Sequence, residues 1–160
     1  MSPITPDQFQ ILLPLACEWA ETQEQFILKN GTSLSPSQIA DARLVGVTHP
    51  ESIKILAVPQ IPLPEHPALR TAAQEIQLIT PSTSGLTLRY GIYIQSYFLS
   101  DRRLIVHEFV HTSQYERFGG FLPFLQQYLS ECITIGYPNA PMEQEAIRIA
   151  DQIWRVVGPS

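Results

Sequence analysis

The sequence predicts an α+β fold in which a small, mostly antiparallel sheet packs against a central helix and further helices complete the core. Two segments between residues 52 and 97 are rich in β-branched and aromatic residues, a composition typical of strands. The segments before residue 30 and after residue 100 carry apolar residues three and four positions apart, the spacing of amphipathic helices. With 44% apolar residues among 160, we expect one packed domain over residues 1–160.

A long amphipathic helix is predicted from Thr5 to Leu28, with Asn30-Gly31 as its stop signal. Its apolar positions recur along one face: Phe9, Leu12, Leu13, Ala16, Trp19, Ala20 and Phe26. Its acidic residues Glu18, Glu21 and Glu24 are expected on a solvated face.

The middle of the chain alternates short elements. In order, we expect a short helix at Pro36–Leu44, a strand at Ser52–Val58, an extended proline-rich connection at Pro59–Pro67, a short helix at His66–Ile76, and a strand or hairpin at Gly85–Tyr97 that is broken near Gly91.

Three helices are predicted in the last third of the chain. Ser100-Asp101 offers the cap of the first helix, and Gly119-Gly120 ends it. The second helix fits Phe121–Ile135. A rigid turn rich in proline and glycine follows, and the third helix fits Pro141–Val157, with proline in its first turn.

Charge and cysteine content narrow the function classes. The net charge is −5, and the basic residues form no stripe that would bind phosphate backbones, so no nucleic-acid partner is expected. Cys17 and Cys132 each lie in an apolar helical stretch, where a free thiol behaves as a small hydrophobic residue. This placement favours free thiols over a structural disulfide, and Cys132 is expected in the core. No apolar run is long enough to span a membrane and no secretion leader opens the chain, so we expect a cytoplasmic protein.

The motif His107-Glu108-Phe109-Val110-His111 carries the chemical information of the sequence. On a helix, positions four apart share one face, so both imidazoles reach a single ion while Glu108 lies beside them. Catalytic zinc uses three protein ligands and keeps one position for water, so the motif needs a third ligand. The metzincin arrangement is excluded, because Gln114 and Arg117 occupy its glycine and histidine positions.

A later helix offers two candidates for the third ligand. Glu143 and Glu145 both lie in the first turns of the last predicted helix. The intervening helix is only about 22 Å long at 1.5 Å per residue, so a chain that turns twice brings either carboxylate back to the histidines. Spacing alone leaves both candidates open.

The H-E-x-x-H motif followed by Glu143-Gln144-Glu145-Ala146 resembles the glutamate-zincins, or gluzincins, a group of zinc metallopeptidases. The resemblance covers about residues 85 to 151. It implies a zincin-like fold, a Zn²⁺ cofactor held by His107, His111 and Glu143, and Glu108 as the general base. It further implies that the strand near Gly91–Gln95 is the sheet edge along which a peptide or protein substrate pairs.

The chain departs from the gluzincin pattern at two places. Ile147 stands where related motifs carry an aspartate that orients a histidine, and Asp151, one turn later, is the candidate replacement. No histidine follows His111, so the group that stabilises the developing oxyanion is sought among Tyr93, Arg89, Tyr115 and Tyr137.

The sequence therefore predicts a zinc-dependent hydrolase, a peptidase that uses a zinc-activated water. The alternative is a non-hydrolytic zincin-like module that binds or regulates a partner. His49 and His66, each next to a proline, are expected at the surface and outside the metal site.

Overall fold

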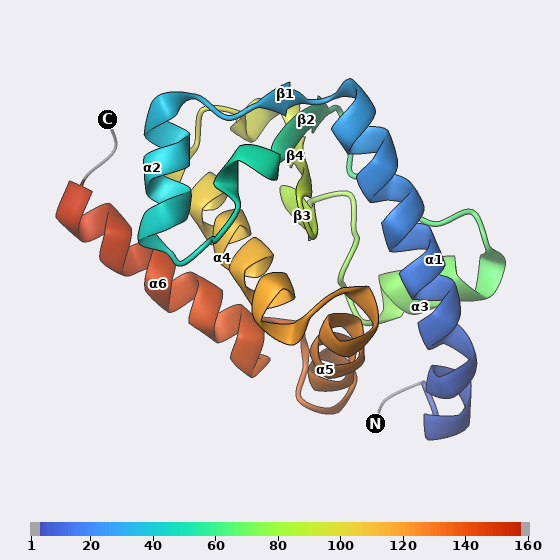
Figure 1. Cartoon of the computed structure of the whole chain (residues 1–160). Coiled ribbons are helices and arrows are strands. Elements are labelled where there is room, and N and C mark those ends of the chain that lie inside the picture. Colours follow the sequence, from blue (N-terminus) through green and yellow to red (C-terminus); the bar gives the residue numbers. More distant parts are fainter. Residues whose placement is uncertain (1–3, 158–160) are drawn as a thin grey trace.

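The computed structural model describes residues 4–157, and over that range it contains six α-helices and one small mixed sheet (Figure 1). The helices are α1 (Pro6–Asn30), α2 (Pro36–Leu44), α3 (Pro67–Glu75), α4 (Arg102–Phe118), α5 (Phe121–Thr134) and α6 (Pro141–Val157). The strands are β1 (Thr32–Ser33), β2 (Lys54–Val58), β3 (Gly85–Leu88) and β4 (Gly91–Gln95). The α+β class and every predicted helix are confirmed, with ends that shift by at most two residues.

Side-chain caps explain where the first helices begin. The hydroxyl of Thr5 accepts a hydrogen bond from the backbone NH of Gln8 at 3.1 Å, and the Gln8 side chain accepts one from the backbone NH of Thr5 at 2.8 Å. Ser35 and Gln38 make the same reciprocal pair at the start of α2. Each pair satisfies two backbone donors that the helix itself leaves free.

The sheet is mixed, with strand order β1-β2-β4-β3. The two outer pairings, β1 with β2 and β3 with β4, are antiparallel, and the central pairing of β2 with β4 is parallel. The sheet is therefore mixed, with more antiparallel than parallel pairings, and its short strand β1 was not predicted. The expectation that Gly91–Gln95 forms the edge is wrong, because β4 has a partner on each side. Its Ile92 and Ile94 are fully buried, as suits an interior strand. The edge on this side is β3.

Helix α4 lies along the centre of the molecule and packs against both α6 and β3 (Figure 1). Its N-cap is Asp101, whose carboxylate accepts a hydrogen bond from the backbone NH of Leu104 at 3.1 Å. Its C-cap is Gly119, whose φ of 92° suits a residue without a side chain. Apolar residues of α4 join a core cluster with the sheet, α2 and α6, while α1, α3 and α5 enclose a second cluster.

The turn between β3 and β4 depends on a buried acid from α1. Arg89, with a φ of 61°, donates from Nε and Nη2 to the Glu24 carboxylate at 2.8 and 2.7 Å. The backbone NH of Tyr90 donates to the same carboxylate at 3.1 Å. Glu24 is buried, so its expected place on a solvated face is wrong, because the helix pattern could not show that an arginine turn from the sheet covers it.

Cys17 and Cys132 are free thiols, and Cys132 is buried in the core, as predicted. Among the helices within residues 4–157, none combines the length and the apolar character needed to cross a membrane.

Candidate metal site

The structure brings together the two histidines of the motif and one glutamate of α6. Oε1 of Glu143 lies 2.7 Å from Nε2 of His107, and Oε2 lies 3.1 Å from Nε2 of His111. The three ligand atoms all fall within 4.8 Å of one another. Four ligands placed tetrahedrally at about 2.05 Å from zinc lie about 3.3 Å apart. The two distances from Glu143 to the histidines, 2.7 and 3.1 Å, are close to that spacing.

Burial and neighbouring charges have opposite effects on the pKa values of His111 and Glu143. Burial lowers the pKa of His111, but the hydrogen bond and the negative charge of Glu143, with the charge of Glu108, outweigh it and raise this pKa to about 9. Burial likewise raises the pKa of Glu143, and the hydrogen bonds from the two histidines reverse that effect and bring the pKa well below its ordinary value. Glu143 is therefore an anion at neutral pH, as a metal ligand has to be.

Glu145, the other candidate for the third ligand, points away from the histidines. Its Oε1 accepts hydrogen bonds from Nε2 of Gln114 at 2.8 Å and from Nη2 of Arg117 at 2.6 Å. Burial raises the pKa of Glu145, but the hydrogen bonds from the Arg117 guanidinium and the Gln114 amide outweigh it and bring this pKa below its usual value. The structure thus places Glu143, and not Glu145, with the two histidines.

The side chain of Gln114 orients the imidazole of His111 through Nδ1, the ring nitrogen that does not face Glu143. Nε2 of Gln114 donates to the backbone oxygen of Met142 at 2.9 Å and to Glu145, so its Oε1 is left as the acceptor that faces Nδ1 of His111 at 2.8 Å. Nδ1 of His111 therefore donates to Gln114, and Nε2, which faces Glu143, is the nitrogen that becomes a metal ligand once it loses its proton. Such a partner fixes both the tautomer and the ring orientation of a metal-binding histidine.

Glu143 is positioned from α5. Its Oε2 accepts a hydrogen bond from the buried hydroxyl of Tyr128 at 2.8 Å. One turn further along α5, Glu131 accepts a hydrogen bond from the backbone NH of Met142 at 2.9 Å, which caps the start of α6. Helix α5, which the sequence indicates only as a spacer, therefore supplies a hydrogen-bond partner for Glu143 and also the cap of α6, the helix that carries Glu143.

Glu108 lies beside the cluster and is held by β3. Its Oε1 accepts a hydrogen bond from the hydroxyl of Thr87 at 2.7 Å, and its Oε2 lies 4.0 Å from Nε2 of His107. A Cβ at Gly85 would lie 3.1 Å from the carboxyl carbon of Glu108, so glycine lets the strand come this close. Glu108 is buried, and within residues 4–157 its Oε2 has no hydrogen-bond partner and lies on the side of His107.

Comparison with models of protein families, with curated proteins and with solved structures finds no match to this chain.

An open cleft of about 770 Å³ leads to the cluster from the solvent. The loop between α3 and β3, the first turns of α4 and one face of α6 form its walls. The residues that line it and also belong to the cluster or its immediate surroundings are Gly85, His107, Glu108, Tyr137 and Glu143. The cluster can therefore be reached from the solvent and is not sealed in the core.

Three of the four candidates for an oxyanion-stabilising group are engaged elsewhere. Arg89 binds Glu24, the hydroxyl of Tyr93 donates to Gln23 at 2.5 Å, and the buried hydroxyl of Tyr115 donates to the backbone oxygen of Thr87 at 3.4 Å. Tyr137 alone of the four lines the cleft. Burial, followed by the charges of Glu143 and Glu108, raises the pKa of Tyr137, so its phenol stays protonated and able to donate.

Asp151 does not replace the missing aspartate, because it pairs with Arg103 at the surface. His49 and His66 lie outside the cluster, as predicted. The imidazole of His66 caps α3 by accepting from the backbone NH of Leu69, and His49 is exposed beside Glu51. The supporting residues that sequence reasoning missed are Thr87, Gln114, Tyr128 and Glu131, and among them only Gln114, three positions after His111, had a spacing that indicates contact.

Proposed function

We propose that this chain is a zinc-dependent peptidase of the gluzincin type. The observation that carries the proposal is the cluster of His107, His111 and Glu143 beside the carboxylate of Glu108. Two of its members, His107 and Glu143, line an open cleft. Two imidazoles and one carboxylate are the donor set of catalytic zinc sites that keep one position for water. A purely structural zinc would favour four protein ligands.

A zinc ion held by His107, His111 and Glu143 would supply Lewis acidity, to polarise a substrate carbonyl and to bring the pKa of water toward neutrality. The chain's own residues have separate tasks. Glu108 takes the proton of the attacking water and delivers it to the leaving nitrogen. Thr87 holds the carboxylate of Glu108 in the orientation that this transfer needs. Tyr137 donates a hydrogen bond to the carbonyl oxygen as negative charge develops there.

The edge strand β3 supports a peptide substrate. Ser84 accepts a hydrogen bond from the backbone NH of Gln95 at 2.8 Å, and antiparallel bonding alternates, so the backbone groups of Gly85 face away from β4. Gly85 also lines the cleft next to Glu108. An extended peptide that pairs with this edge passes its backbone in front of the metal cluster.

The test of the metal site is elemental analysis of the protein after reconstitution with zinc and removal of excess ion. We expect about one zinc per chain in the wild type and a strong loss in His107→Ala and Glu143→Ala. His49→Ala is the matched control, because that histidine is exposed and lies outside the cluster. Wild-type protein that retains no zinc would overturn the proposal.

The test of catalysis is Glu108→Gln, assayed on a library of unstructured peptides. An enzyme keeps its zinc in this variant and loses turnover by roughly 100- to 10,000-fold, the contribution of a positioned general base. A non-hydrolytic module would instead show no cleavage in the wild type, with zinc bound in both proteins.

A further inference from the structure

A second, apolar cavity of about 100 Å³ adjoins the metal cluster. It lies between α1, α3, α5 and β3, and both Glu108 and His111 are among its lining residues. Gly85, Glu108 and Tyr137 line this cavity and also the open cleft, so the two spaces are neighbours beside the cluster. A substrate that lies in front of Glu108 therefore has a polar space and an apolar space within reach.

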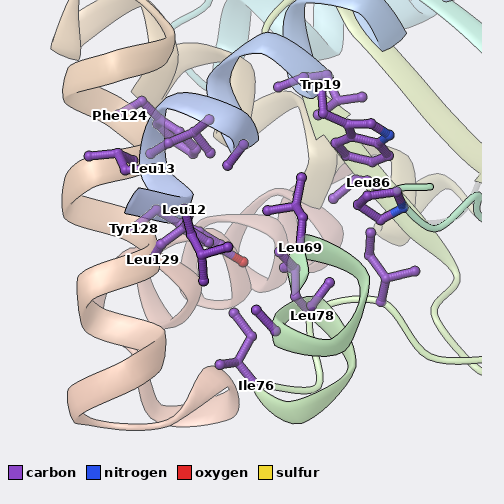
Figure 2. Close-up of a pocket in the computed structure, with 18 of the residues that line it drawn as sticks. Leu12, Leu13, Trp19, Leu69, Ile76, Leu78, Leu86, Phe124, Tyr128 and Leu129 are labelled. Atoms are coloured by element: carbon purple, nitrogen blue, oxygen red, sulfur yellow. The ribbon is translucent and has the colours of Figure 1, made fainter. Parts of the chain in front are cut away.

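The walls of the cavity are made almost entirely of carbon. Figure 2 shows apolar side chains that line it from four elements: α1 (Leu12, Leu13, Trp19), α3 (Leu69), β3 (Leu86) and α5 (Leu129). Among the described residues that line it, only Glu108 and His111 carry a charge near neutral pH. A polar group that entered the cavity would give up its hydrogen bonds to water and find few partners, so the cavity favours apolar groups.

The volume of the cavity limits the size of the group that it holds. An apolar cavity of about 150 Å³ accommodates benzene, which has six carbon atoms. At about two thirds of that volume, this cavity suits a group of roughly four carbon atoms. The side chains of leucine, isoleucine and methionine have about that size, whereas the benzyl group of phenylalanine exceeds it. Helices α1 and α3, which form part of the wall, lie outside the gluzincin-like residues, so this size limit is a property of the present chain.

We propose that this cavity is a specificity pocket for one residue next to the scissile bond, and that it takes the side chains of leucine, isoleucine and methionine and excludes aromatic and charged ones. The inference rests on the proposed function, because the pocket is defined by its place beside Glu108. The scissile carbonyl lies at the metal cluster, the aliphatic side chain enters the cavity, and the rest of the peptide lies in the open cleft. The substrate class is therefore a peptide or protein segment with an aliphatic residue at the cleaved bond.

Three hydroxamates with different groups on the carbonyl test the pocket without relying on turnover. They are acetohydroxamate, 3-methylbutanohydroxamate, which carries the isobutyl group of leucine, and phenylacetohydroxamate, which carries the benzyl group of phenylalanine. Each is titrated calorimetrically into the zinc-loaded wild-type protein, where the hydroxamate binds the metal. We expect the isobutyl compound to bind roughly 60-fold more tightly than acetohydroxamate, from about fourfold for each of its three additional carbons. The benzyl compound should bind less tightly than the isobutyl compound, because the cavity does not hold its ring.

Two variants change the size of the cavity in opposite directions. Ala16→Leu fills it from α1 and should remove the advantage of the isobutyl compound while the binding of acetohydroxamate is unchanged. Leu129→Ala enlarges it from α5 and should raise the affinity for the benzyl compound roughly tenfold. The matched controls are the same changes at exposed positions, Ala40→Leu on α2 and Leu122→Ala on α5, and both should behave as the wild type.

The possible results separate this pocket from the metal site. Equal affinity of the wild type for all three hydroxamates, or preferences that are the same in both cavity variants as in the wild type, would overturn the pocket and leave the peptidase proposal intact. Tighter binding of the benzyl than of the isobutyl compound to the wild type would overturn the size limit. No binding of any hydroxamate would instead overturn the metal site, on which both proposals rest.

Discussion

Nδ1 of His111 donates a hydrogen bond to Oε1 of Gln114 over 2.8 Å, and the same amide is fixed to α6 through Met142 and Glu145. One side chain of α4 thus orients a metal-binding candidate on its own helix and also holds the helix that carries Glu143. The geometry of the three-residue cluster therefore depends on this amide as well as on the three residues themselves.

Gln114→Leu is expected to weaken zinc binding by roughly 10- to 100-fold, because His111 loses the acceptor that fixes its tautomer and ring orientation. Competition with a chromophoric chelator measures this affinity. Gln126→Leu, at an exposed position of α5, is the control and should leave affinity unchanged. If the wild type and both variants bound zinc equally tightly, Gln114 would not be needed to orient His111 for metal binding.

The metal-free protein is expected to lose stability as the pH rises through about 9. The folded pKa of His111, about 9, is above its ordinary value of 6.5, so the protonated imidazole contributes stability that is fully present below pH 6.5 and disappears above pH 9. Urea unfolding of the zinc-free protein at several pH values measures this. Glu143→Gln removes the main source of the raised pKa and should flatten the profile, whereas an equally steep profile in that variant would contradict the assignment.

Thr87→Val is expected to lower kcat roughly tenfold while zinc content is unchanged, because Glu108 loses the hydrogen bond that orients its carboxylate. Thr87→Ser keeps a hydroxyl at the same place and should restore most of the rate. Steady-state kinetics of the three proteins at full zinc occupancy make the comparison. A loss of zinc in Thr87→Val would point to a structural role for this residue instead.

Glu24→Gln is expected to lower the free energy of unfolding by about 3 kcal/mol, since it leaves Arg89 and the β3–β4 turn without their buried anion. Glu21→Gln, on the exposed part of the same helix, should change it by less than about 0.5 kcal/mol. Denaturant titrations measure both. If the two variants were equally stable, Glu24 would not hold the turn.

The helices were predictable because each carries its own signals within a few residues. The α4 boundaries follow from Asp101 at one end and Gly119 at the other, and the proline at the start of α6 sets its first turn. The hairpin at residues 85–95 was also visible from its alternation, and the break near Gly91 is the turn between β3 and β4. Helix ends and the hairpin turn are set by residues within a few positions of one another, so they can be predicted directly from the sequence.

The arrangement of the strands was not predictable in the same way. The parallel pairing of β2 with β4 joins Lys54 to Gly91 across a connection that contains α3 and β3, and no local pattern encodes it. This pairing is why β3 and not β4 borders the cleft. Likewise, the choice of Glu143 over Glu145 depends on Gln114 and Arg117, two residues of another helix whose contacts exist only in the folded chain.

Helix α1 encloses the apolar cavity together with α5, and their contacts join parts of the chain that are about one hundred residues apart. During synthesis, the apolar face of α1 therefore leaves the ribosome long before the helix that covers it exists. Pairing of α4 with α6, whose cluster residues are 36 positions apart, closes a much shorter loop. The metal cluster should thus form quickly once α6 has been made, whereas the apolar face of α1 stays uncovered through the synthesis of about one hundred residues until α5 is available.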